Sequence, residues 1–274
     1  MTGETMVELC FNCMNRSAYL LGQEDPDLPG QIRAAGAAGF KWIGPDFFSI
    51  QRFCEDGGRV EDLAAQVEAA GLRTFELPTL MIGQDVNQVR RDVEAMLPAA
   101  RILRPAFVQI NVESNVDEGV LAETRRAAER FGEIGAELAI EYLPWLPEIN
   151  RMSATRSMID RIADPRVKLL VDTWHFFHSQ DTWAELEALP LSEIAYVQFD
   201  DHPPLESEDL IAETVGRRVM PGEGVFALDR FCDVIRAKGF NGIVSCEILS
   251  EETRGMARLE FAERVYSSCA KYWN

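Results

Sequence analysis

Basic residues are scarce in this sequence, and no apolar run is long enough to span a membrane. Lysine and arginine number 27 against 45 aspartates and glutamates, so the formal net charge is -18 at pH 7. That charge repels phosphate backbones and anionic lipid, and we expect neither a nucleic acid nor a membrane as a partner. The first ten residues, MTGETMVELC, carry acid where a secretory signal carries base. We therefore expect a cytoplasmic protein.

Cysteine is also sparse, with six residues scattered over 274 positions. A chain of this length does not need disulfide bonds to stabilise its core, so we expect reduced thiols. Cys10 and Cys13 form a CxxC motif, but a zinc site with four sulfur ligands needs a second such pair, which the sequence lacks. We interpret these two cysteines as small apolar residues of a strand.

Apolar residues make up 47% of the chain, and they form short strand patterns that alternate with longer helical patterns. Several helical patterns end in a glycine just before the next strand, as expected for a left-handed helix cap: Gly39, Gly71, Gly135 and Gly239. The expected strands are residues 6–12, 41–46, 72–78, 106–112, 137–144, 167–174, 194–201 and 242–249. Helical patterns follow them, which gives eight βα units.

Eight βα units without a linker or a low-complexity break predict an α/β fold, a single (β/α)8 TIM barrel that occupies residues 1–274 as one domain. The alternative is a doubly wound open sheet. It is disfavoured because no glycine-rich phosphate loop follows the first strand, where the sequence reads NCMNR. In a TIM barrel, catalytic residues lie at the carboxyl ends of the strands, so polar residues there are the candidates for function.

A polar side chain lies at the end of each of the last four apolar strand runs: Glu141, Asp172, Gln198 and Glu247. A buried carboxylate at such a position is costly unless a cation or another partner compensates its charge. Three carboxylates and an amide oxygen form a hard donor set that suits Mn²⁺ or Mg²⁺, and Co²⁺ less particularly. The alternative for each acid is an ion pair with Arg or Lys, or a helix cap. The coincidence of four such residues favours the metal site.

The three histidines, His175, His178 and His202, all follow the ends of the sixth and seventh expected strands. A lone histidine is usually structural, but His175 lies three residues after Asp172, so both side chains can face one cavity. We expect His178 on the outer part of its loop. His202 is followed by two prolines, and we expect it at the rim of the site as a substrate contact.

The loop after the seventh strand contains GRRVMPGEG, residues 216–224. Arg218 in this loop can hold a substrate oxygen, and the alternative is a surface ion pair with Glu223. Trp145 and Trp174 follow the fifth and sixth strand patterns and can form an aromatic wall of the site, although core packing explains Trp174 equally well.

Three earlier loops, residues 12–17, 46–48 and 80–84, are expected to determine which substrate fits. The aromatic segment PDFFSIQRF at residues 45–53 is apolar enough to form a lid or a subunit contact of a homo-oligomer.

These patterns resemble the xylose-isomerase-like TIM-barrel family, which includes sugar isomerases and epimerases, inosose isomerases and dehydratases, hydroxypyruvate isomerases and 3-dehydroshikimate dehydratases. The resemblance covers nearly the whole chain and is strongest in AIEYLP, VDTWHFF, VQFDD, RVMPGEG and SCEI. The metal ligands that it implies are Glu141, Asp172, Gln198 and Glu247. It also implies substrate-binding roles for His175, which completes the DxxH element, and for Arg218, which precedes PGxG.

One position departs from many sugar epimerases of that family, which carry His where this chain has Gln198. Gln at this position is similar to the hydroxypyruvate isomerase and dehydroshikimate dehydratase branches. Endonuclease IV is a relative with three metals and several more histidine ligands, and this chain has only three histidines.

The donor set and the resemblance together predict a divalent-metal-dependent isomerase or epimerase of a keto-sugar or keto-cyclitol. We expect Mn²⁺ as cofactor, a small polyhydroxylated keto compound as substrate, and Glu141 and Glu247 as the catalytic acid/base pair. The predicted substrate contacts are His175, Arg218, Trp145 and His202. The alternatives are a metal-dependent dehydratase, a lyase of the 3-dehydroshikimate dehydratase type, and a non-catalytic sugar-binding barrel.

Overall fold

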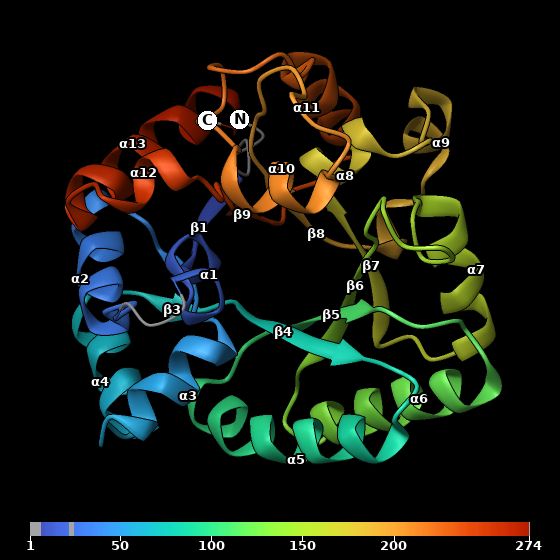
Figure 1. Ribbon diagram of the computed structural model, residues 1–274, viewed down its shortest axis with the longest axis horizontal. Coiled ribbons are helices and arrows are strands. Elements are labelled where there is room, and N and C mark those ends of the chain that lie inside the picture. Colours follow the sequence, from blue (N-terminus) through green and yellow to red (C-terminus); the bar gives the residue numbers. More distant parts are fainter. Residues whose placement is uncertain (1–6, 22–24, 274) are drawn as a thin grey trace, which may run out of the picture.

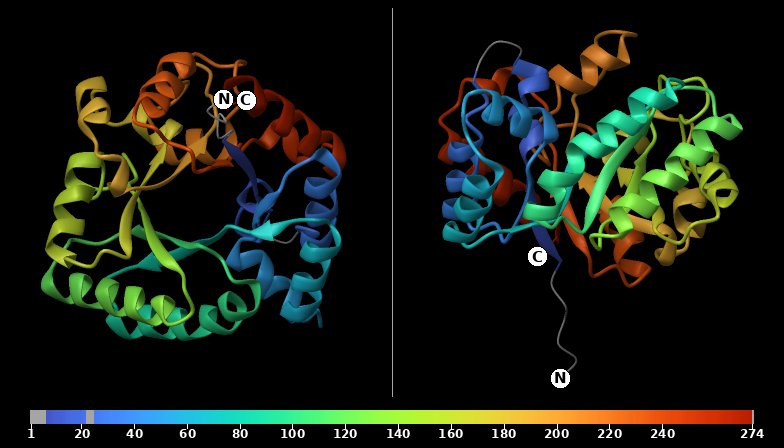
Figure 2. Two further views of the ribbon diagram at one scale, coloured as in Figure 1. Left: turned by 180° about the vertical axis from the view of Figure 1, so that it is seen from behind. Right: turned by 90° about the horizontal axis from the view of Figure 1, so that it is seen from below.

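The structure is a computed structural model that describes residues 7–21 and 25–273. Strands and helices alternate along the chain, and in Figure 1 the strands form an inner ring that the helices surround. Figure 2 shows the helical layer around the strands from behind and from below. The architecture is an α/β TIM barrel, so the predicted fold is confirmed.

All pairings between the nine strand segments of the described residues are parallel. Their order in the sheet is β3-β2-β1-β9-β8-β7-β6-β5-β4. Apolar residues dominate most of them because a barrel strand is covered on both sides. The strands are β1 (Glu8–Asn12), β2 (Trp42–Gly44), β3 (Arg73–Thr74), β4 (Glu76–Ile82), β5 (Phe107–Val112), β6 (Glu137–Glu141), β7 (Val167–Asp172), β8 (Ile194–Phe199) and β9 (Ile243–Cys246).

The third strand of the barrel is divided into β3 and β4, which lie at the two ends of the strand order. β3 pairs with β2, and β4 pairs with β5. Between them, the backbone N–H of Phe75 donates to the carbonyl of Ile43 at 2.9 Å, and the carbonyl of Phe75 accepts from the N–H of Phe107 at 3.1 Å. One chain segment therefore joins both ends of the sheet, which excludes the open doubly wound alternative.

Side-chain caps begin several of the outer helices. Asp85 accepts backbone N–H groups at the start of α5, Asp117 does so at α6, and Thr182 forms a capping box with Glu185 at α9. No helix among the described residues is long and apolar enough to cross a membrane. The helices are α1 (Ala18–Leu21), α2 (Leu28–Ala38), α3 (Phe47–Glu55), α4 (Val60–Ala69), α5 (Val86–Leu103), α6 (Glu118–Gly132), α7 (Met152–Ile162), α8 (Thr173–His178), α9 (Trp183–Ala188), α10 (Leu210–Gly216), α11 (Leu228–Ala237), α12 (Glu251–Arg254) and α13 (Arg258–Trp273), with short 3-10 helices η1 (Cys13–Arg16) and η2 (Leu191–Glu193).

Six strand ends differ from the prediction, since five strands end two or three residues early and the third ends later. The third strand, expected to end at residue 78, continues as β4 to Ile82, so part of the expected 80–84 loop is strand. The sixth strand ends at Asp172, two residues early, because the Asp172 carboxylate accepts the N–H of His175 and so caps α8.

Two segments without an expected helix contain one. The aromatic segment at 45–53 lies largely in α3, whose first turn is capped by Asp46, and the long loop after β8 contains α10. Cys10 and Cys13 are both buried thiols without a disulfide, as the sequence suggests. Cys13 lies in η1 rather than in a strand, because the Asn12 side chain accepts the N–H of Met14 and turns the chain.

Candidate active site

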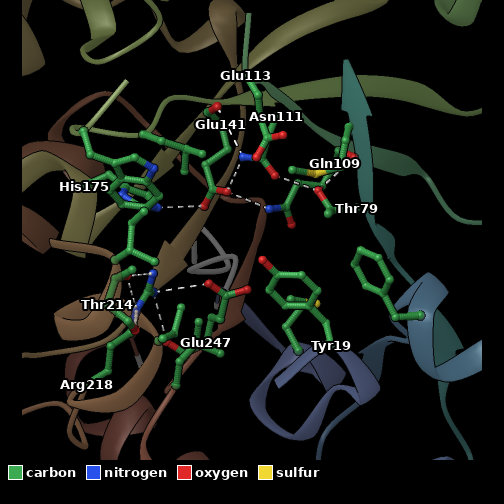
Figure 3. Close-up of a pocket in the computed structure, with 18 residues that line it drawn as sticks. Tyr19, Thr79, Gln109, Asn111, Glu113, Glu141, His175, Thr214, Arg218 and Glu247 are labelled. Atoms are coloured by element: carbon green, nitrogen blue, oxygen red, sulfur yellow. Dashed lines mark hydrogen bonds and ion pairs between the residues drawn. The ribbon is translucent and has the colours of Figure 1, made fainter. Parts of the chain in front are cut away.

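A pocket of about 370 Å³ opens at the carboxyl ends of the strands. Figure 3 shows a polar side, on which Glu141, His175, Arg218 and Glu247 project into the cavity. Facing them are apolar lining residues, namely Met14, Tyr19, Phe48, Met81, Trp145 and Leu249. The volume suits a small molecule, and an amphipathic lining of this kind is typical of ligand sites.

The four predicted metal ligands are all buried at this end of the barrel. Glu141 and Asp172 end β6 and β7, Gln198 lies in β8 opposite Asp172, and Glu247 follows β9 directly. Glu141 and Glu247 line the pocket, whereas Asp172 and Gln198 lie beneath its surface with no exposed area.

The Gln198 amide determines how well these four residues suit a cation. In one orientation its NH₂ donates to Glu141 Oε1 at 2.7 Å and to Asp172 Oδ2 at 3.3 Å. In the other orientation the amide oxygen occupies that position, and three oxygen atoms face one another without a hydrogen between them. A cation or a shared proton is needed to stabilise that second arrangement. The donor set therefore fits a divalent metal ion, with the amide oxygen turned toward it.

His175 joins the same group of acids. Its Nε2 atom lies 3.2 Å from Glu141 Oε1, and its backbone N–H donates to Asp172 Oδ1 at 3.0 Å. One potential ligand atom from each of Glu141, Asp172 and His175 lies within 4.8 Å of the other two. The predicted substrate contact is therefore adjacent to the predicted metal ligands and lines the pocket with them.

Arg218 is the permanent cation of this cluster. Its Nη1 atom lies 3.0 Å from Asp172 Oδ2, 2.5 Å from Asp200 Oδ2 and 3.2 Å from Glu247 Oε2. The alternative partner Glu223 pairs instead with Arg264. Burial would lower the pKa of the Arg218 guanidinium, but the adjacent carboxylates raise it overall.

One guanidinium does not balance the acids around it. Burial raises the pKa of the Glu247 and Asp200 carboxyls well above their usual range, although Arg218 opposes the shift in both. Neighbouring carboxylates raise both pKa values further. A bound divalent cation would favour the ionised form of these carboxyls, which is a second reason why the cluster suits a metal.

Sequence comparison agrees with this fold. A model of the xylose isomerase-like TIM barrel family matches residues 31–265. The chain belongs to this family.

Curated relatives of this xylose isomerase-like barrel are enzymes. The chain is 25% identical over 241 residues to a 3-dehydroshikimate dehydratase of Pseudomonas aeruginosa, an alignment that covers 83% of this chain and 37% of that protein. It is 26% identical over 135 residues to an inosose isomerase of Halalkalibacterium halodurans, covering 48% of this chain and 45% of the isomerase. The chain thus spans less than half the length of either relative in these alignments.

Solved structures share the fold. An IolI protein with a bound zinc atom has a TM-score of 0.84 and 18% identity, covering 98% of this chain and 100% of that one. An L-ribulose 3-epimerase has a TM-score of 0.74 and 16% identity, covering 98% and 95%. At these identities the similarity shows the common architecture of the family.

In this family member, sequence reasoning missed two residues that hold Glu141. Gln109 and Asn111 lie two positions apart in β5 and both donate to Glu141 Oε2 at 2.8 Å. The signal was present, because two amides alternate with Val108, Ile110 and Val112 in a strand that is otherwise apolar. The prediction rested on the ends of the last four strands and therefore did not include Gln109 and Asn111.

Sequence reasoning also missed the two acids after β8. Asp200 contacts Arg218, and the Asp201 carboxylate accepts the backbone N–H groups of Gly222, Gly224 and Phe226. A Cβ on Gly224 would lie 2.2 Å from Asp201 Oδ1, so the turn requires glycine there. These contacts fix the PGEG loop that carries Arg218 into the pocket.

Trp145 and His202, both predicted substrate contacts, lie in different places. Trp145 lines the pocket, with its ring centroid 5.6 Å from that of His175. His202 is buried away from the described lining residues, where Nδ1 lies 2.6 Å from the carbonyl of Pro203 and Nε2 lies 3.4 Å from Glu213 Oε2. Its geometry is that of a residue that packs behind the pocket.

Proposed function

We propose that this protein is a divalent-metal-dependent isomerase or epimerase of a neutral keto-sugar or keto-cyclitol. The observation that carries the proposal is the convergence of the Glu141 and Asp172 carboxylates and the Gln198 amide beside a pocket that Glu141 and Glu247 line. The relatives and the fold of the family support it, since isomerases, epimerases and dehydratases occur among them.

The residues that would hold the metal are Glu141, Asp172, Gln198 and Glu247. All offer hard oxygen atoms, for which Mn²⁺ is our first choice and Mg²⁺ or Co²⁺ the alternatives. When bound, such a cation polarises the carbonyl of the substrate and acidifies the neighbouring C–H.

The protein itself supplies proton transfer and orientation. Glu141 and Glu247 are the candidates for removing and returning the proton, because both carboxylates border the cavity. His175 borders it too and can donate from Nε2 to a substrate oxygen on which charge accumulates. Trp145 supplies an apolar wall for the carbon skeleton.

A neutral substrate fits the charges of the lining. Arg218 is the only Lys or Arg among the described lining residues, and its three guanidinium nitrogens all contact protein acceptors. Glu113, Glu141 and Glu247 add carboxylates to the same lining. A substrate carboxylate or phosphate would therefore find no unengaged Lys or Arg among the described lining residues, whereas hydroxyl groups would find acceptors. Arg218 is better suited to orient the acids than to bind an anionic group.

The second candidate is a metal-dependent dehydratase of the 3-dehydroshikimate dehydratase type. Gln198 favours it, because glutamine at this position resembles that branch of the family. The alignment with the P. aeruginosa dehydratase also includes most of this chain. Expulsion of a β-hydroxyl after the same proton abstraction would give this outcome.

The decisive experiment follows substrate C–H bonds by NMR in D₂O. The Mn²⁺-loaded protein would be incubated with keto-sugars, keto-cyclitols and 3-dehydroshikimate. Deuterium in a rearranged product supports the isomerase or epimerase, and loss of water supports the dehydratase. A protein that binds no Mn²⁺ and exchanges no C–H in this panel would instead be a sugar-binding barrel.

The variant E247Q tests the proton-transfer role. We expect turnover to fall about a thousandfold while much of the bound Mn²⁺ remains. E223Q is the matched control, because Glu223 lies in the same loop as Arg218 but pairs with Arg264. Near-normal turnover of E247Q would remove Glu247 from the mechanism.

A further inference from the structure

The two pocket carboxylates proposed for proton transfer, Glu141 and Glu247, have different surroundings. Glu141 Oε2 accepts two hydrogen bonds, from Gln109 Nε2 and Asn111 Nδ2, each 2.8 Å long. Glu141 Oε1 lies 3.2 Å from His175 Nε2. The Oε2 atom thus accepts from two donors, and rotation of the carboxylate would break both hydrogen bonds inside a buried network. Figure 3 shows the two amides pointing at Glu141 from β5.

The two amides are themselves held in place. Asn111 lies opposite Glu141 in the register of β5 and β6, and its Oδ1 atom accepts from Thr79 Oγ1 at 2.8 Å. Gln109 lies on the same face of β5, with its terminal Oε1 atom 3.1 Å from the amide of Gln198. Both amide side chains are buried, and they border the pocket beside Glu141.

The two oxygens of Glu247 differ from each other. Its Oε1 atom accepts from Asn12 Nδ2 at 3.0 Å and from Gln198 Nε2 at 3.4 Å, and its Oε2 atom lies 3.2 Å from Arg218 Nη1. That nitrogen carries two hydrogens and lies closer to Asp172 and Asp200, at 3.0 and 2.5 Å. Those two acids therefore use the hydrogens of Nη1, which leaves Oε2 of Glu247 available to accept a proton from a molecule in the pocket.

We propose that Gln109 and Asn111 are positioning residues that hold Glu141 as a fixed ligand carboxylate, so that Glu247 alone moves the substrate proton. The inference rests on the proposed function and narrows it. One carboxylate acts on one face of the substrate, so the reaction is an isomerisation or a dehydration. Inversion at a single carbon needs a second proton donor on the opposite face, which the clamped Glu141 does not supply.

The steps balance with one carboxylate. Glu247 takes the proton from the carbon next to the carbonyl, and the C–H electrons form the double bond of an enediolate. Glu247 returns the proton to the neighbouring carbon on the same face, while the hydroxyl proton passes to the former carbonyl oxygen. In a dehydration, the protonated Glu247 instead delivers its proton to the β-hydroxyl, which leaves as water.

The hold of Gln109 and Asn111 on Glu141, here called the clamp, is tested first without any reaction. The test is a calorimetric titration of Mn²⁺ into the metal-free protein. The double variant Q109M/N111L keeps the side-chain sizes but removes both donors to Glu141. We expect its Mn²⁺ affinity to fall tenfold or more, as for other residues that orient metal ligands. The matched control T79V alters the same network without touching Glu141, and its affinity should stay within about threefold. Circular dichroism checks folding, and the single variants Q109M and N111L replace the double variant if it does not fold.

A double variant, or both single variants, with an Mn²⁺ affinity within twofold of wild type would overturn the clamp. The one-face reaction is tested on the wild-type protein in D₂O with the same panel of keto compounds. We expect rearranged or dehydrated product and no epimer at the exchanged carbon. Formation of such an epimer would overturn the assignment of Glu247 as the sole proton carrier. If the Mn²⁺-loaded protein exchanges no C–H at all, the proposed function fails, and the Mn²⁺ affinities alone then decide the clamp.

Discussion

Two groups of buried acids lie in successive layers of the barrel interior, and they are neutralised differently. Glu76 belongs to the lower layer, where its carboxylate contacts the hydroxyl of Ser245 and the thiol of Cys10. Tyr196 lies two residues before Gln198, and Ser245 lies two residues before Glu247. This spacing places Tyr196 and Ser245 one layer closer to the amino ends of the strands. In the upper layer, a guanidinium faces Asp172, Asp200 and Glu247.

The difference shows what makes a buried acid available to a cation. Burial raises the pKa of Glu76 to about 7, and its hydrogen-bond partners only partly oppose this shift. It therefore carries a proton at neutral pH in a large part of the molecules. Burial raises the pKa of Asp200 and Glu247 as well, but there the guanidinium of Arg218 opposes the shift. The two layers thus differ in their partners, because a hydroxyl and a thiol contact Glu76 whereas a cation contacts the upper acids.

Removal of Arg218 should abolish the difference between the two layers, and we expect it to have the largest effect on the unfolding free energy. R218M leaves Asp172, Asp200 and Glu247 buried without their common partner, and we expect a loss of about 3–5 kcal/mol of unfolding free energy. Mn²⁺ should restore part of that loss, because it supplies positive charge at the same place. Urea denaturation with and without Mn²⁺ measures both effects.

R264M is the control for R218M, since Arg264 makes an exposed ion pair with Glu223 and should contribute about 1 kcal/mol or less. Equal stabilities of R218M and R264M would contradict the account of the upper layer.

Replacement of Glu76 tests the lower layer through the pH dependence of the unfolding free energy. The folded chain keeps the Glu76 proton up to about pH 7, whereas the unfolded chain releases it near the ordinary value of 4.5. This proton therefore stabilises the folded state fully below about pH 4.5, and its contribution disappears as the pH rises through 7. E76Q removes that dependence, which amounts to about 3 kcal/mol.

The measurement for E76Q is the unfolding free energy at several values between pH 4.5 and 8. The wild-type curve should fall relative to that of E76Q, while the exposed-site variant E223Q should run parallel to wild type. Parallel curves for wild type and E76Q would show that Glu76 is ionised in the folded protein.

The smallest effect concerns a base beside the upper layer. Burial, with the neighbouring His202 and His175, lowers the pKa of His178 from 6.5 to about 4. The unfolded chain takes up a proton first, so stability should fall as the pH drops from 6.5 to 4. Because His178 is partly exposed, we expect about 1–2 kcal/mol. H178F should flatten this acid limb, and an unchanged slope would contradict the assignment.

Local patterns predicted much of the fold. The helical pattern between the third and fourth expected strands coincides with α5, because the apolar periodicity and the Asp85 cap of this helix are contained in one short stretch. The third strand was harder to predict. It continues past residue 78 because β5 offers it backbone partners, and strand partners are not encoded next to each other in the sequence.

In the candidate site, too, local patterns could be predicted and contacts between distant residues could not. Glu141, Asp172, Gln198 and Glu247 could be picked out because each ends an apolar run, and the structure brings them together. The partners of Arg218 could not, because Asp172, Asp200 and Glu247 come from separate strands that meet only in the folded barrel. His202 illustrates the limit in the other direction, since a position after a strand end does not determine whether a ring faces the cavity or the helices behind it.

Because Asp201 anchors the PGEG turn, the position of Arg218 and the shape of the pocket mouth can change independently. The turn is tied to β8 by three backbone hydrogen bonds to one carboxylate, and the intervening residues 203–217 play no part in that tie. That intervening segment carries Ile211 and Val215 to the pocket mouth. Substitutions or insertions in this segment should alter which molecules enter the pocket and leave the Arg218 guanidinium in place. The substrate preference of the barrel can therefore change without a change in its chemistry.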